Sequence, residues 1–222
     1  MIIFGRHQPE NYMKKNLFLL LSLLFAIASF SQKKAVTETG DEVILYEDGT
    51  WKYSNDSSRT KSEISVNPKP FKKSDNATFL LKSANTDAGI WIDSKKWSFK
   101  KAEINEAAEY QLQLKGKDLY AMIITEKIEV PLETLKAVAL ENARSAASDA
   151  EIVKQEYRTV NDKKILFLQI NGTTQGIKFA YYGYYYSNEN GTVQVITYTA
   201  QKLLNGFKAD AEDLLNGFVT TK

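Results

Sequence analysis

The chain has 222 residues, of which 43% are hydrophobic and 25% are charged, a composition that excludes disorder throughout and allows one domain with a core plus a small appendage. Lysine and arginine together number 29 against 27 acidic residues, so the charge gives no reason to expect a nucleic-acid or anionic-lipid partner. The absence of cysteine excludes disulfides, thiolate nucleophiles, thiolate zinc sites and a cysteine-linked lipid anchor.

The N-terminal stretch is typical of a secretory signal. Lys14 and Lys15 precede fourteen mostly apolar residues, a run shorter than the roughly 20 residues of a membrane-spanning helix. Small residues at Ser29 and Ser31 predict cleavage after Ser31. We therefore expect residues 1–31 to be a signal peptide and the protein to be periplasmic or secreted, with no stable membrane span after cleavage. An uncleaved anchor is the alternative.

Residues 1–12 fit poorly ahead of such a signal, because acidic and proline residues precede the two lysines. Met13 is therefore the alternative start of the chain. His7 is the only histidine and would not be present in the mature protein. A Ser-His-Asp triad, a histidine general base and the usual histidine metal sites then have no candidate residue. We predict neither a metal nor a cofactor.

A small β-hairpin is predicted over residues 35–54. Two β-type runs flank Asp48-Gly49, and Asp-Gly is a strong hairpin signal because both residues tolerate positive φ. An isolated hairpin is marginal in water, so Trp51 and Tyr53 must pack on something. Trp51 is a speculative ligand-binding residue, and a tryptophan folded over onto its neighbours is the more ordinary alternative.

The hairpin sequence, TxxGDEVILYEDGTWKY, resembles a short Asp-Gly-Thr-Trp motif near the mature N-terminus of many exported proteins of the Bacteroidetes type. The resemblance covers about twenty residues and implies no activity. Residues 55–75, which follow, are rich in Ser, Asn, Lys and Pro. Such a composition buries too little surface to offset its ordering entropy, so this segment is predicted to be a linker.

Residues 76–222 are predicted to form an α+β domain. Pro131 begins the clearest helix, which ends near Ser148, and a C-terminal helix is expected from about 208 to 216, because Gly206 argues against an earlier start. The expected sheet is antiparallel, with about six or seven strands. Its strands would come from nine candidate runs, alternating or β-rich, at 78–81, 89–92, 97–99, 108–114, 119–128, 151–160, 164–170, 177–187 and 192–200.

Three stretches of this domain, GIWIDSKKW, EKIEVPLETLKAVALENAR and FAYYGYYYSNENGTVQVITYTAQ with the later LLNGF, together resemble the Mog1/PsbP-like α/β/α sandwich of small exported bacterial proteins. The resemblance spans about residues 78 to 220 and consists of element order and hydrophobic outline. It implies a mostly non-catalytic module that binds a partner. It carries over no functional residue, because no motif of chemistry matches.

The run 181–186 is the most unusual feature of the chain. On a strand Tyr182, Tyr184 and Tyr186 share one face, and Tyr181 and Tyr185 share the other. An exposed stripe of Tyr182, Tyr184 and Tyr186 would be a candidate site for a sugar or a peptide. The alternative is aromatic cross-strand pairing inside a sandwich that is buried on both faces.

Carboxylates offer the only acid–base chemistry in the mature chain. Glu126, Glu129 and Glu133 lie close together in sequence, and a carboxylate pair at a suitable distance could hydrolyse a glycoside. Acidic residues near a helix N-terminus are also favourable simply through the helix dipole.

The sequence therefore predicts an exported, non-catalytic domain that binds an unknown protein partner or ligand in the cell envelope. One alternative is a carbohydrate-binding module that uses the tyrosine stripe and binds an envelope glycan. A carboxylate-dependent envelope hydrolase is a further alternative.

Overall fold

The computed structural model describes residues 33–37, 42–46, 49–54, 64–103 and 107–221. The predicted signal peptide, residues 1–31, and the alternative start at Met13 lie outside the described residues. The chain divides into two compact units, which are considered separately. None of the described helices is long and apolar enough to cross a bilayer.

The first unit carries a three-stranded sheet in the order β1-β2-β3. Strands β2 and β3 pair antiparallel with Leu45 opposite Trp51, and Gly49 has a φ of 80°, so the predicted hairpin is present. β1 is a third strand that the sequence did not predict. The three strands are β1 (Lys33–Val36), β2 (Glu42–Leu45) and β3 (Trp51–Tyr53).

The second unit is built on an eight-stranded sheet in the order β4-β10-β11-β12-β13-β9-β8-β7. The predicted meander from β10 to β13 is confirmed, with antiparallel pairing throughout. The sheet is mixed rather than antiparallel, because β4 runs parallel to β10. Its strands are β4 (Val66–Phe71), β7 (Trp97–Lys101), β8 (Ala108–Leu114), β9 (Tyr120–Glu126), β10 (Glu151–Val160), β11 (Lys163–Thr174), β12 (Ile177–Asn188) and β13 (Gly191–Ala200).

Strand β4 corrects the linker prediction, which covered residues 55–75. The backbone N–H of Tyr157 donates to the carbonyl of Ser65, and the N–H of Asn161 donates to that of Phe71. An edge strand tolerates proline on its solvent side, and the buried ring of Phe71 anchors this one. The composition of residues 66–71 does not predict this strand, because its pairing partner is the long and distant strand β10.

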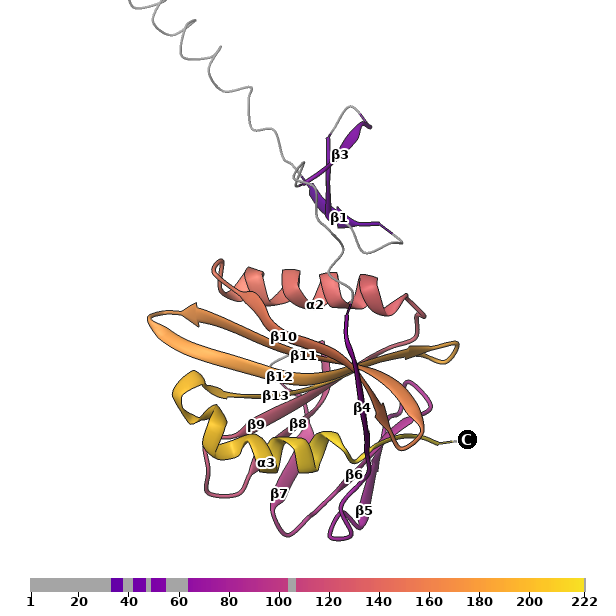
Figure 1. The fold of residues 1–222 in the computed structure, drawn as a ribbon, viewed down its shortest axis with the longest axis vertical. Helices are drawn as coiled ribbons and strands as arrows, with labels where there is room; N and C mark the ends of the chain where they lie inside the picture. Colours follow the sequence, from indigo (N-terminus) through magenta and orange to yellow (C-terminus); the bar gives the residue numbers. More distant parts are fainter. Residues whose placement is uncertain (1–32, 38–41, 47–48, 55–63, 104–106, 222) are drawn as a thin grey trace, which may run out of the picture. The chain divides into compact units, whose positions relative to one another are not determined.

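Two helices lie on opposite faces of the large sheet (Figure 1). α2 (Leu132–Ala146) is the helix predicted from Pro131, which lies directly before its first turn, and it packs against β10, β11 and β12. α3 (Leu204–Leu215), which follows the short 3-10 helix η1 (Gln201–Leu203), covers the other face at β12 and β13. Both faces of the central strands are therefore buried.

α3 starts four residues earlier than predicted and contains Gly206 in its first turn. Burial of Leu204, Ala211, Leu214 and Leu215 outweighs the helix penalty of one glycine, which is about 1 kcal/mol. After the helix, β14 (Phe218–Thr220) joins β6 (Ala88–Ile92) and β5 (Phe79–Lys82) in a second, three-stranded sheet.

Two glycines of the C-terminal segment should respond to alanine in opposite directions. A Cβ on Gly217 would collide with the carbonyl of Trp91, whereas nothing lies within 4 Å of a Cβ on Gly206. Gly217→Ala should lower the free energy of unfolding by about 2 kcal/mol or more, and Gly206→Ala should raise it by about 1 kcal/mol. Urea titration measures both. Destabilisation by Gly206→Ala would contradict the early helix start.

Candidate functional site

The predicted tyrosine stripe is largely core. Tyr182 and Tyr184 are each 1% exposed beneath α3, and Tyr186 is half-buried with its ring centroid 5.1 Å from that of Phe218. Tyr185, on the opposite face, is also 1% exposed and packs in the α2 core. The prediction of an exposed stripe is wrong for Tyr182 and Tyr184, because a helix lies over each face of β12.

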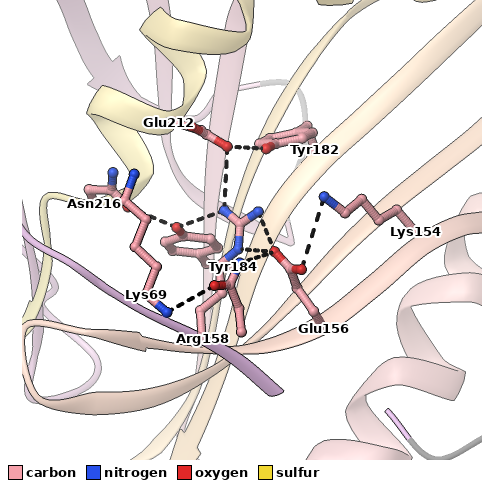
Figure 2. Close-up of polar contacts among 9 residues, drawn as sticks. Lys69, Lys154, Glu156, Arg158, Tyr182, Tyr184, Glu212 and Asn216 are labelled. Carbon is pink, nitrogen blue, oxygen red and sulfur yellow. Dashed lines mark hydrogen bonds and ion pairs between the residues drawn. The ribbon is translucent and has the colours of Figure 1, made fainter. Parts of the chain in front are cut away.

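Beneath α3, Tyr182 and Tyr184 lie beside a buried cation, the guanidinium of Arg158 on β10 (Figure 2). The Arg158 side chain is 2% exposed. Its Nε and Nη2 atoms both lie 2.6 Å from Oε1 of Glu156, two residues away on the same strand. The Nδ2 atom of Asn67 on β4 donates to the same oxygen at 3.2 Å.

The network continues from Arg158 into α3. Nη1 of Arg158 donates to the hydroxyl of Tyr184 at 3.1 Å, and that hydroxyl donates to Oδ1 of Asn216 at 2.8 Å. Nη1 also lies 3.6 Å from Oε1 of Glu212. The hydroxyl of Tyr182 donates to the same Glu212 oxygen at 2.5 Å. The phenol oxygens of the predicted stripe are therefore used inside the protein.

Aromatic rings complete the surroundings of the cation. The guanidinium carbon of Arg158 lies 3.9 Å from the ring centroid of Phe167 on β11 and 4.6 Å from that of Phe71 on β4. Cation–π contacts of this kind are strongest where water is excluded. Arg158 thus joins β4, β10, β11, β12 and α3 through one side chain.

The ionisation of the network follows from its burial. Burial raises the pKa of Glu156, but hydrogen bonds from Arg158 and Asn67 and the nearby positive charges outweigh it, so this pKa lies below its ordinary value. Burial raises the pKa of Tyr184 to about 12 and also raises that of Tyr182. At neutral pH the phenols are uncharged donors and Glu156 is a carboxylate.

This arrangement stabilises the fold and offers little for catalysis. The carboxylates of Glu156 and Glu212 both face Arg158 and act as its counter-ions. A general acid would need a carboxyl whose pKa is raised toward neutrality. Among the residues that the structure describes, no three His, Cys, Asp or Glu side chains gather closely enough to hold a metal ion.

The three glutamates that the sequence offered as catalytic candidates are either paired with other side chains or exposed to solvent. Glu133 accepts a hydrogen bond from the hydroxyl of Tyr157 at 2.9 Å and pairs with Lys136 at 2.9 Å. Glu126, at the end of β9, and Glu129 are exposed. Glu133 lies in the first turn of α2, where the helix dipole favours an acidic residue, and this position accounts for it without a catalytic role.

Comparison with known proteins gives a match in structure alone. No protein family matches the sequence, and no curated protein is similar to it. The cyanobacterial PsbP protein (CyanoP) of Synechocystis sp. PCC 6803 superposes with a TM-score of 0.52 at 10% identity, over 64% of this chain and 91% of that one. The main domain has a PsbP-like fold.

A weaker likeness is to LpqN of Mycobacterium tuberculosis, a protein involved in cell envelope biogenesis. It has a TM-score of 0.42 at 11% identity, over 61% of this chain and 83% of that one. The likeness to CyanoP confirms the PsbP-like fold expected from the outline of the sequence, while an identity of 10% extends to no function.

A second tyrosine row on the PsbP-like domain was missed by the sequence analysis. Tyr181, Tyr198 and Tyr120 stand opposite one another on β12, β13 and β9. The rings of Tyr120 and Tyr198 are stacked 5.5 Å apart, and those of Tyr181 and Tyr198 meet edge-on at 6.2 Å. We call these three residues the tyrosine row. All three are partly exposed.

The tyrosine row extends in register to exposed polar residues on the last two strands. Gln113 of β8 lies opposite Tyr120, and Ser98 of β7 lies opposite Gln113. The row lies on the α2 side of the sheet, yet α2 packs mainly on β10 to β12, so this end of the face is less covered. No sequence signal could identify the row, because the register between β9 and β13 is a tertiary feature.

Two further surface features lie away from the buried network. Trp51 is 53% exposed, and its ring meets that of Tyr53 edge-on at 5.3 Å, so both the binding interpretation and local aromatic packing fit it. A shallow groove of about 480 Å³ is lined by Gly176, Ile177, Lys178, Ala200, Gln201 and Lys202. It contains none of the predicted site residues.

Removing the buried cation should be costly. Arg158→Met leaves the Glu156 carboxylate without its main partner, and we expect a loss of about 3 kcal/mol or more in the free energy of unfolding, measured by urea titration. Lys154→Met removes only a long, exposed pair with the same carboxylate, 4.0 Å from Oε2 at a position 47% exposed; it is the matched control and should change stability by less than about 1 kcal/mol. Equal effects of the two variants would refute the role of Arg158.

Acid should weaken the same network. Because the pKa of Glu156 is lowered in the folded protein, its contribution to stability is complete above the unfolded pKa of about 4.3 and is lost as pH falls through the folded value. The stability difference between the wild type and Glu156→Gln should therefore shrink as pH falls below that value. Urea titrations at neutral and acidic pH test this; a difference that stays constant would contradict it.

Proposed function

We propose that this protein is an exported, non-catalytic domain that binds a protein partner in the cell envelope. The observation that carries the proposal is the tyrosine row, which places three partly exposed phenols side by side and continues into exposed Gln113 and Ser98. Tyrosine is enriched at protein interfaces because its ring is apolar and its hydroxyl can form hydrogen bonds. The signal-like N-terminus supports the location.

The ring geometry favours a protein over a glycan. A sugar stacks on the open face of an aromatic ring, but the rings of Tyr120 and Tyr198 are only 23° from parallel and lie against each other. The row therefore offers ring edges and hydroxyls more than faces. Such a surface suits the mixed apolar and polar contacts of a protein interface.

The absence of catalysis is proposed from the state of the acidic side chains. Glu156 and Glu212 are counter-ions of Arg158, and Glu133 pairs with Lys136 and Tyr157. A carboxylate-dependent hydrolase would need one of its acids to be free to exchange a proton with substrate.

Trp51 of the first unit is a second candidate contact for the proposed protein partner.

Substitutions in the tyrosine row should weaken partner binding. Cross-linking of the exported protein in the cell envelope, followed by mass spectrometry, identifies the partner, and titration with that purified partner gives the affinity. Tyr120→Ser combined with Tyr198→Ser should reduce the affinity by about tenfold or more. Retained affinity in this double variant would refute the tyrosine row as the binding surface.

Two control variants separate the alternatives. Ile177→Ser alters a more accessible apolar residue, 63% exposed, in the shallow groove, and should leave the affinity within about twofold, as expected for a residue outside the interface. Trp51→Ser measures the contribution of the first unit. Circular dichroism of all variants shows whether the fold is intact.

A further inference from the structure

The outer strands of the two sheets in the main domain differ in how their backbone edges are protected. The large sheet is bounded by β4 and β7, and the small sheet by β14 and β5. An outer strand carries backbone N–H and C=O groups that can pair with another chain unless something blocks them. The residues and hydrogen bonds at each of the four edges show whether its outward backbone groups are blocked.

Three of these edges are obstructed. On β4, Pro68 and Pro70 have no N–H to donate. On β14, the carbonyl of Phe218 accepts a hydrogen bond from Nδ2 of Asn161 at 2.8 Å. On β5, the carbonyl of Lys82 accepts from the hydroxyl of Tyr110 at 3.2 Å.

The β7 edge is open, as the register of its pairing with β8 shows. The N–H of Lys115 donates to the carbonyl of Lys96 at 2.9 Å, and that of Ala102 donates to the carbonyl of Glu109 at 3.1 Å. Antiparallel strands alternate bonded and non-bonded residue pairs, so Ser98 and Lys100 bond to β8. The backbone groups of Phe99 and Lys101 consequently point out of the sheet.

The side chains at this edge combine apolar and basic character. Phe99 on β7 is 39% exposed and Phe79 on β5 is 42% exposed, and their ring centroids lie 5.2 Å apart. Lys95 and Lys101 are exposed. Two other lysines have acidic neighbours: Lys100 pairs with Glu103 at 2.8 Å, and Lys96 lies 3.4 Å from Asp210 of α3.

We propose that the β7 edge binds an extended acidic segment of the protein partner as an added strand. An apolar residue of that segment would pack on Phe99 and Phe79, and acidic residues would face the lysines, while its backbone would bond to Phe99 and Lys101. This proposal rests on the proposed function and adds where the partner binds. Ser98, which continues the line of the tyrosine row beyond Gln113, belongs to β7.

Charge distinguishes this occupant from a second copy of the chain. Antiparallel pairing of two β7 strands would bring the basic sequence KKWSFKK of each copy against the other. Like charges directly opposite in a sheet are destabilising, and lysine on an edge is a common device against self-association. The same lysines attract a segment rich in glutamate or aspartate.

The probe is a nine-residue peptide of glutamate and valine with phenylalanine at its centre and glutamate two positions to either side, so that on one face its phenylalanine packs on Phe99 while a glutamate meets Lys101. Amide hydrogen exchange of the full protein is followed by NMR with increasing peptide. The amides of Phe99 and Lys101 should exchange about tenfold more slowly at saturation, whereas those of Ser98 and Lys100, already bonded to β8, should change little. Protection elsewhere, or none, overturns the proposal.

A pair of variants at one position isolates the backbone contribution. Lys101→Ala and Lys101→Pro both remove the charge, but only proline removes the outward N–H, and it breaks no hydrogen bond to β8. Peptide affinity should fall at least about fivefold further in Lys101→Pro than in Lys101→Ala, because a ladder bond is lost. Equal affinities of the two variants would overturn strand addition.

Two more outcomes are decisive. If the protein without peptide protects the Phe99 and Lys101 amides as its concentration rises, and sedimentation shows a dimer, a second copy is the occupant and the proposal fails. If the partner found by cross-linking loses affinity with the Tyr120→Ser and Tyr198→Ser double variant but not with Lys101→Pro, the edge proposal fails while the proposed function stands.

Discussion

Burial of one guanidinium constrains most of the main domain. A charge as buried as that of Arg158 must be neutralised and hydrogen-bonded on all sides, and its partners come from separate elements: Glu156 from β10, Tyr184 from β12 and Glu212 from α3. These elements can meet only if β4 and α3 close over the same end of the sheet. The position of α3 thus follows from a polar requirement as well as from its leucines.

The same requirement explains why this part of β12 carries tyrosine rather than phenylalanine. Phenylalanine would fill the core equally well, but it could neither accept a hydrogen bond from Arg158 nor donate one to Glu212 and Asn216. An unusual cluster of tyrosines is therefore a structural device on the α3 side of the sheet. On the α2 side, the three tyrosines of the tyrosine row are partly exposed.

The domain is asymmetric in a way that bears on recognition. At one boundary of the large sheet, prolines of β4 and the Arg158 network close the edge and the face together. At the other boundary, β7 ends the sheet with outward backbone groups, exposed Phe99 and the end of the tyrosine row. The proposed binding surface therefore lies at the boundary that the Arg158 network does not cover.

The sequence alone determined the order of the longer elements, the β10 to β13 meander, helix α2 and the first-unit hairpin, because periodicity and turn residues such as Asp48-Gly49 act over a few positions. Its outline also indicated the PsbP-like fold. Only the tertiary structure decided that residues 66–71 form a strand, that α3 includes Gly206, and which tyrosines are buried. Those outcomes depend on what lies across the sheet, such as Arg158 facing Tyr184 and Tyr198 facing Tyr120, and contacts between distant positions leave no local pattern in the chain.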